Sequence, residues 1–452
     1  MRRGYVGVLS LILVTVFVTA SAMAGGGPKG PSGASFKNFQ LSQPEGDSEP
    51  AVSFGPDGTV VLGGLSWLLF QTNIWKGSFG VAPAFIGPID AHIGTGIGGG
   101  DEDLDFGSTG TLHASTLMFF FNPVMNRFQL GVSAIACPNF AQATGFSNCK
   151  AQIIDTTQAD RQWVTSDGKS VYISYHDNGH SALIHVQRSL DDGFTWRTVG
   201  NPIVGADGVT ADSTFNNQQG NLVADPSTHF VFAIFAAGEP SIQKGTTANF
   251  NNIFVSRSED RGITWTASLV FHAPLNKALN VIFPALAVDP IAGTLYASWS
   301  DAHNVFVSTS RDHGSSWSSA VAVNQDPVVT AIFPAIAARN GHVVLAYYGT
   351  TATSKDDPNA VWNTFMAQSD DGVQWSQSVV SDHPNHVGVI CTRGTGCANP
   401  LVTRTLLDLF EVSISPVNGM AAVIYTDDTL TTFTFRGTTF PLPQVIVGYQ
   451  TS

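Results

Sequence analysis

An eight-residue pattern, S-x-D-x-G-x-[TS]-W, recurs along the middle of the chain and constrains its fold more than any other feature. Complete copies begin at Ser189, Ser258 and Ser310, and a copy that is one residue shorter begins at Ser369. Each copy lies between two short runs of strand-forming residues, which predicts a hairpin turn. Recurrence of one unit every 52 to 69 residues indicates a repeat architecture.

Every recurring position of this pattern has a structural purpose in a turn. An aspartate can accept backbone N–H groups within its own turn, and a glycine adopts a positive φ without steric cost. A tryptophan is large enough to pack over the turn and between neighbouring sheets. We therefore expect these residues to be structural rather than catalytic. They are Ser189, Asp191, Gly193, Trp196, Ser258, Asp260, Gly262, Trp265, Ser310, Asp312, Gly314, Trp317, Ser369, Asp371, Gly372 and Trp375.

A second type of hairpin recurs seven times along the chain. It consists of a strand, a turn that is usually D-G, D-P or N-G, and a second apolar strand. The turns lie at residues 56–58, 107–110, 167–168, 225–226, 289–290, 340–341 and 416–419. The pattern predicts an all-β propeller, in which each of these hairpins supplies the two inner strands of a four-stranded blade. Seven blades are favoured and six are the alternative, and pairing of residues 35–41 with 444–449 would close the ring.

The four S-x-D-x-G turns resemble the Asp-box, or BNR, repeat of the sialidase-like β-propellers. This resemblance implies a propeller fold over residues 35–452. Sialidases themselves have six blades, whereas the hairpins counted here number seven.

The resemblance also implies what a sialidase site would need. It would have an early arginine in an R-I-P-like motif, two later arginines, an aspartate as acid/base and a tyrosine activated by a glutamate. The sequence has no arginine between residues 3 and 127 and no R-I-P segment, so the resemblance does not extend to the catalytic set. Glu239, Tyr425 and either Arg393 or Arg404 match by their order in the chain alone.

The first 24 residues have the features of a secretory signal peptide. Arg2 and Arg3 form a positive n-region, residues 6–20 are apolar, and residues 22–24 form an A-x-A cleavage site. The apolar run is too short for a transmembrane helix, so no membrane span is expected after cleavage. Residues 25–34 are rich in glycine and proline and are expected to be flexible, and residues 35–452 are expected to form a single propeller domain. The sequence thus predicts a secreted protein, extracellular or periplasmic.

The four cysteines are Cys137, Cys149, Cys391 and Cys397, and they allow three pairings. With an export signal, disulfides are expected, and the local pairs 137–149 and 391–397 are favoured over a zinc site. The formal net charge of −13 does not suit a nucleic acid or an anionic membrane surface as partner.

Ligands of propellers usually lie over the central channel, where the inner strands begin and where the loops that follow the second strands converge. The polar residues at these places are the candidate site. The ligand-binding candidates are Glu49, Asp160, Arg161, Asp177, Arg404 and Asp408. The catalytic candidates, which are weaker, are Asp103, Asp160, Arg161, Glu239, Arg404, Asp408 and Tyr425.

Two of these features also have plainer interpretations. An arginine fork at Arg161 or Arg404 could bind a carboxylate, but it could equally form a salt bridge between blades. The acids of residues 101–105 could bind Ca²⁺, but they lack EF-hand spacing and could instead form a solvated loop. No cofactor and no metal site is therefore predicted.

The sequence is compatible with three functions. The leading hypothesis is a secreted propeller that binds a carbohydrate or an extracellular protein at its channel. The first alternative is a glycoside hydrolase in which Asp103 or Asp160 pairs with Asp408 or Glu411. The second is a structural or adhesion module of the cell envelope.

Overall fold

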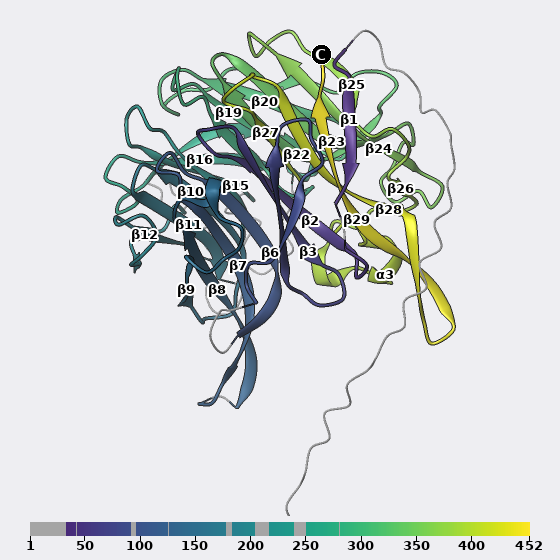
Figure 1. The fold of residues 1–452 in the computed structure, drawn as a ribbon. Helices are drawn as coiled ribbons and strands as arrows, with labels where there is room; N and C mark the ends of the chain where they lie inside the picture. The colour runs from purple at the N-terminus through teal and green to yellow at the C-terminus, as the bar shows by residue number, and fades with distance from the viewer. Residues whose placement is uncertain are drawn as a thin grey trace, which may run out of the picture.

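Seven antiparallel sheets surround a common axis, so the chain folds as a seven-bladed β-propeller (Figure 1). The computed structural model describes residues 33–41, 43–91, 96–124, 126–177, 183–203, 217–238, 250–279 and 281–452. The predicted signal peptide and residues 25–32 lie outside this range. The all-β prediction and the count of seven blades are confirmed, and the alternative of six blades is wrong.

Each blade is named here by its place in the chain, with its strands given from the channel outward. Blade 1 contains β2 (Asp47–Phe54), β3 (Thr59–Ser66), β4 (Thr72–Ser78) and β5 (Ala84–Pro88). Blade 2 contains β6 (Gly96–Phe106), β7 (Leu112–Asn122), β8 (Arg127–Cys137) and β9 (Lys150–Asp155). Blade 3 contains β10 (Ala159–Asp167), β11 (Ser170–Asp177), β12 (Ile184–Ser189) and β13 (Arg197–Thr198). Blade 4 contains β14 (Asn217–Ala224), β15 (Val231–Ala237), β16 (Asn252–Ser258) and β17 (Thr266–His272).

The last three blades complete the ring. Blade 5 contains β18 (Ala285–Val288), β19 (Leu295–Ser300), β20 (Val305–Ser310) and β21 (Val321–Ala322). Blade 6 contains β22 (Thr330–Arg339), β23 (His342–Thr350), β24 (Val361–Ser369) and β25 (Ser376–Val379), and β26 (His386–Val387) pairs with β24. Blade 7 contains β27 (Glu411–Ile414), β28 (Ala421–Phe435), β29 (Thr438–Gln450) and β1 (Phe36–Gln40). Among the described residues, the short helical turns are η1 (Phe140–Gln142), η3 (Gly394–Gly396) and α3 (Pro400–Thr403).

The two ends of the chain close the ring within blade 7. β1 pairs antiparallel with β29, with Phe36 opposite Gln450 and Gln40 opposite Ile446. This is the closure that the sequence predicts. Because the first strand is the outermost strand of the last blade, blade 7 is built from both ends of the chain.

The four S-x-D-x-G turns join the third and fourth strands of blades 3 to 6. In the first, Ser189 Oγ donates to Asp191 Oδ1 at 2.8 Å and accepts the Gly193 N–H at 2.9 Å. The shortened turn keeps both bonds, from Ser369 to Asp371 and from Gly372 to Ser369, each at 2.9 Å. It lacks only the residue before the glycine, which has a positive φ in the complete turns (Asp192, Arg261 and His313).

These turns also contact the preceding blade. Arg188 on β12 donates to the carbonyl of Arg261 at 2.8 Å, and Arg257 on β16 donates to that of His313 at 2.9 Å. The turns therefore lie at the blade boundaries on the outer part of the ring, away from the channel.

Two disulfides join nearby cysteines. Cys137 is bonded to Cys149, and Cys391 is bonded to Cys397, as predicted. The first ties the end of β8 to the segment before β9, and the second closes the segment that contains η3. None of the helices among the described residues is long and apolar enough to cross a membrane.

Five inner strands, β2, β6, β10, β14 and β22, contain a β-bulge or register shift, and four of these have a non-glycine residue in the left-handed region. These residues are Glu49 (φ 49°), Asp101 (φ 35°), Arg161 (φ 58°) and Phe333 (φ 58°). A bulge bends its strand and re-aims the side chains beside it. The bulges therefore fix how charged side chains are presented at one end of the channel.

Candidate binding channel

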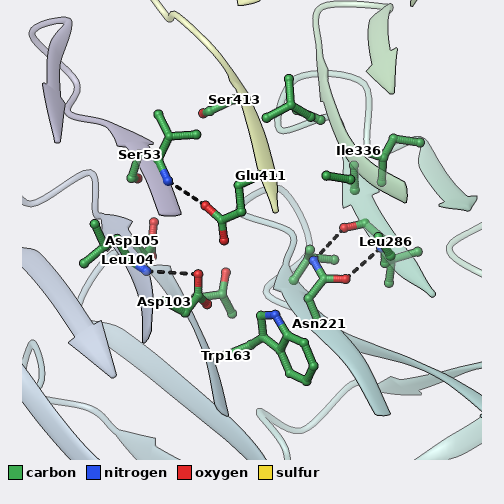
Figure 2. A pocket seen from close by; sticks show the side chains of 18 of the residues that line it. Ser53, Asp103, Leu104, Asp105, Trp163, Asn221, Leu286, Ile336, Glu411 and Ser413 are labelled. Atoms are coloured by element: carbon green, nitrogen blue, oxygen red, sulfur yellow. Dashed lines mark hydrogen bonds between the residues drawn. The ribbon is translucent and has the colours of Figure 1, made fainter. Parts of the chain in front are cut away.

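Residues from all seven inner strands line a cavity of about 560 Å³ along the propeller axis (Figure 2). The lining is chemically divided. Blades 2 and 7 contribute the carboxyl groups of Asp103 and Glu411, whereas blades 5 and 6 contribute apolar residues such as Phe283 and Phe333. One side of the cavity is thus acidic and the other side is apolar.

Asp103 and Glu411 form the centre of the acidic side, where their carboxyl groups point toward each other and interact closely enough to shift each other's pKa (Figure 2). Asp103 Oδ1 accepts the N–H of Leu104 at 2.9 Å, and its Oδ2 accepts the N–H of Val164 on blade 3 at 2.6 Å. Glu411 Oε2 accepts the N–H of Val52 on blade 1 at 2.6 Å (Figure 2). Each carboxyl group therefore also connects its blade to the next one.

Burial keeps this pair partly protonated. Burial raises the pKa of Glu411 to about 7, and the hydrogen bonds from Asp103 and from the Val52 N–H oppose that shift. Burial, followed by the charge of Glu411, raises the pKa of Asp103 well above its usual value. Two carboxyl groups in contact cannot readily both be ionised, so the pair retains at least one proton at neutral pH.

More carboxyl groups lie at the end of the channel where the inner strands begin. Glu49 Oε1 accepts the N–H of Asp408 at 3.0 Å. Burial, then the charge of Asp408, raises the pKa of Glu49 to about 7. Burial and the charge of Glu49 raise the pKa values of Asp101 and Glu102 well above the usual range. The acids of blades 1, 2 and 7 thus form one interacting group.

The two candidate arginines reach this end of the channel but are already engaged. Arg404 donates from Nη2 to Asp408 Oδ2 at 2.6 Å, which with the charge of Glu49 keeps its pKa raised despite burial. Arg161 lies with its guanidinium 5.3 Å from the ring centre of Phe283 and its Nε 3.9 Å from Asp160. Gly394 lies close to both arginine side chains. A Cβ built at this glycine would be 4.0 Å from Arg161 Nη2 and 4.0 Å from Asp408 Oδ2, the oxygen that pairs with Arg404.

Trp163 is a site residue that the sequence candidates do not include. Its ring lies between Asp103 and Asn221 in the view of Figure 2, with its nitrogen toward the cavity. The ring packs edge-on against Phe283 at 5.4 Å between centres. Among the described residues, the indole N–H has no hydrogen-bond partner, so it is available to a ligand.

The remaining candidates are placed elsewhere or not described. Tyr425 is completely buried in the core, with its hydroxyl 3.4 Å from Asn38 Oδ1, and it does not line the cavity. Glu239 and the side chain of Asp177 lie outside the described residues. The structure therefore brings together Glu49, Asp103, Arg161, Arg404 and Asp408.

A segment that joins blades 6 and 7 positions Arg404 and Asp408. His386 Nδ1 lies 2.8 Å from Asp428 Oδ2, and the hydroxyl of Thr405 donates to the same oxygen at 2.5 Å. His383 Nε2 lies 2.8 Å from Asp427 Oδ2, and this bond raises the pKa of His383 to about 9. These contacts hold residues 380–408 against β28.

Within the part of the chain that the structure describes, no three His, Cys, Asp or Glu side chains are grouped as metal ligands would be. The Ca²⁺ interpretation of residues 101–105 gains no support, because Asp103 is directed to backbone N–H groups and to Glu411.

The sequence matches no protein-family model and no curated protein. Among solved structures, the chain is similar to the GH74 xyloglucanase from Xanthomonas campestris at 13% identity and a TM-score of 0.49, over 91% of this chain and 55% of that one. It is similar to the Hadza microbial sialidase Hz136 at 13% identity and a TM-score of 0.40, over 84% and 63% of the two chains. It is similar to the Penicillium chrysogenum alpha-L-arabinanase at 11% identity and a TM-score of 0.43, over 96% and 98%. At these identities the likeness is one of fold alone, and the seven-bladed propeller itself rests on the strand pairing.

Proposed function

We propose that this protein binds a saccharide in its channel and that it acts outside the cytoplasm. The observation that carries the proposal is the cavity itself. It combines an aromatic ring with a free N–H, at Trp163, and hydrogen-bonding carboxyl groups, at Asp103 and Glu411. Saccharides are recognised by such a combination, because their apolar faces pack on aromatic rings and their hydroxyls bond to carboxylates.

The extracytoplasmic location rests on a separate observation. The chain has two disulfides and, among the described residues, no free cysteine. Structural disulfides persist in oxidising compartments and are rare in the cytosol.

A glycan-array screen of the disulfide-bonded protein tests the binding proposal. We expect the protein to bind one class of saccharide on the array. The same saccharide added in solution should displace the protein from the array. Absence of binding to any saccharide would overturn the proposal.

A second candidate function is glycoside hydrolysis, and the Asp103–Glu411 pair favours it. A carboxyl group that keeps its proton near neutral pH is suited to protonate a leaving group. The two carboxyl groups interact closely, however, whereas a retaining mechanism uses carboxyl groups that are roughly 5 Å apart. A substrate would have to separate them, or one of them would have to act with Asp408, which lines the same cavity.

Turnover measurements separate the two candidates. A panel of chromogenic glycosides is incubated with the wild-type protein and with Glu411→Gln. Turnover that the substitution abolishes would favour hydrolysis, whereas array binding without turnover of any glycoside would leave binding as the function.

A further inference from the structure

The ionisable side chains that line the cavity are predominantly acidic, even though the Asp103–Glu411 pair retains a proton. Among the described residues, its carboxyl groups belong to Asp103, Asp105, Asp408 and Glu411, whereas its single basic side chain is Arg339. A cleft lined by one sign of charge concentrates ligands of the opposite sign. An anionic sugar would meet repulsion on this surface.

The arginines near the channel do not reverse this preference. Arg404 is paired with Asp408, and Arg161 lies against the Phe283 ring and near Asp160. Neither arginine lines the cavity, so neither is placed to hold a ligand carboxylate bidentately there. The arrangement therefore disfavours sialic acids and uronic acids as ligands.

Three buried carboxyl oxygens of the acidic group also lack a donor among the described residues. Glu102 is 1% exposed, and neither of its carboxyl oxygens has a hydrogen-bond partner. It lies among the charges of Glu49 and Asp101. Asp408 Oδ1, on a residue that lines the cavity, is likewise buried without a partner. Glu102 does not line the cavity and contributes only to the acidic surroundings, whereas Asp408, which does line it, is best complemented by a ligand that brings donors and positive charge.

An ammonium group has these properties, since it carries three N–H donors, a positive charge and no acceptor. We propose that the saccharide bound in the channel carries a free amino group, as in a hexosamine that is not acetylated. This inference rests on the proposed function of saccharide binding. The ammonium would lie on the acidic side of the cavity, near Asp103, Asp408 and Glu411, and the sugar ring would lie toward Trp163.

The test compares two oligosaccharides of equal length, one of glucosamine and one of N-acetylglucosamine. Both are titrated by calorimetry into the wild-type protein, and a sialylated oligosaccharide of similar size is the third ligand. We expect the free-amine oligosaccharide to bind on the order of tenfold more tightly than its acetylated form. The preference should weaken as salt is added, because screening reduces charge attraction.

Variants assign the preference to the channel. Asp105→Asn and Glu411→Gln each remove one cavity carboxylate and should reduce the preference for the free amine. Glu259→Gln removes one charge from an exposed outer turn, where Glu259 pairs with Arg257, and should leave the preference unchanged. If one of the cavity variants does not fold, the other variant still shows whether the preference depends on the channel, and the wild-type titrations still show whether the preference exists.

The outcomes distinguish this inference from the function on which it rests. Binding of acetylated or sialylated oligosaccharides as tight as that of the free amine would overturn the inference and leave saccharide binding standing. Failure of every saccharide on the array and in the titrations would overturn both.

Discussion

The carboxyl groups of Asp103 on blade 2 and Glu411 on blade 7 face each other and shift each other's pKa, although blade 1 lies between their strands in the ring (Figure 2). Glu411 also accepts an N–H from blade 1, and Asp103 accepts one from blade 3. The pair thus connects four consecutive blades around the cavity. Asp103 accepts two backbone N–H groups, whereas Glu411 accepts one. Substitution of each residue in turn can therefore separate the contribution of the pair to stability from its contribution to ligand binding.

Asp103→Asn should destabilise the protein more than Glu411→Gln. Both oxygens of Asp103 accept a backbone N–H, so one of these donors would face the amide N–H₂ of asparagine. A buried donor left without its acceptor costs about 1–3 kcal/mol. Glutamine at 411 can keep the Val52 bond and donate to Asp103, so its cost should be less than about 1 kcal/mol. Denaturant unfolding at neutral pH measures both variants, and the reverse order would contradict this account.

Thermal stability should fall as the pH rises from 5 to 8.5. Glu49 and Glu411 have folded pKa values of about 7, against an ordinary value of 4.5. A raised pKa means that the folded state binds the proton more tightly. The resulting stabilisation is complete below about pH 4.5 and is lost as the pH rises through about 7. His383 has a folded pKa of about 9, so the stability that its protonated form contributes is also lost as the pH rises toward 9.

Scanning calorimetry across this pH range measures the effect. A fall in Tm of more than about 2 °C is expected, given the usual relation between free energy and Tm in large domains. Glu49→Gln, which removes one of the raised groups, should flatten the profile. A Tm that rises steadily from pH 5 to 8.5 would be incompatible with the carboxyl cluster as described.

The outer turns should affect stability but not ligand binding. Asp260 accepts the N–H groups of Ile263 and Thr264 at 3.1 and 2.8 Å, and these bonds lower its pKa. Asp260→Ala should therefore lower the Tm by a few degrees, whereas Glu259→Ala in the same turn should change it little. An Asp260→Ala variant that keeps its Tm but loses saccharide binding would show that the turn acts at the ligand site instead.

His386 should control the mobility of the segment that carries Arg404 and Asp408. His386 is buried and holds Asp428, which also accepts the hydroxyl of Thr405. In His386→Gln, amide hydrogen exchange should become faster in residues 386–408. His342→Gln is the matched control, because His342 pairs with Asp370 on an exposed turn. Unchanged exchange in residues 386–408 of the first variant would mean that the disulfide alone fixes this segment.

The ring and its closure could be predicted because each blade has local signals. A strand pair joined by Asp167-Gly168 or Asn340-Gly341 is readable within about ten residues, and its recurrence gives the blade count. The predicted pairing of residues 35–41 with 444–449, which ties the two chain ends into one blade, is confirmed by the pairing of residues 36–40 with 446–450.

The candidate site could be predicted only in part. Glu49, Asp103, Arg161, Arg404 and Asp408 were found from their position near the start of inner strands. Trp163 was missed as a ligand group, because only the bulge at Arg161 determines its direction. The contact between Asp103 and Glu411 depends on how blades separated by some 300 residues pack together, which no local pattern encodes. His383 and His386 had a signal in the run Asp382-His383-Pro384-Asn385-His386, but their partners lie on β28.

The most direct test of the central claim, that the channel cavity is the ligand site, is a calorimetric titration of two matched tryptophan variants with a saccharide that the wild-type protein binds. Trp163→Phe removes an indole N–H that faces the cavity, and Trp196→Phe removes one that bonds to the Gly193 carbonyl in an outer turn. We predict that Trp163→Phe weakens binding by about tenfold, the loss expected for one hydrogen bond, while Trp196→Phe retains the wild-type Kd. Equal affinity in the Trp163→Phe and wild-type proteins would contradict the assignment of the channel as the site.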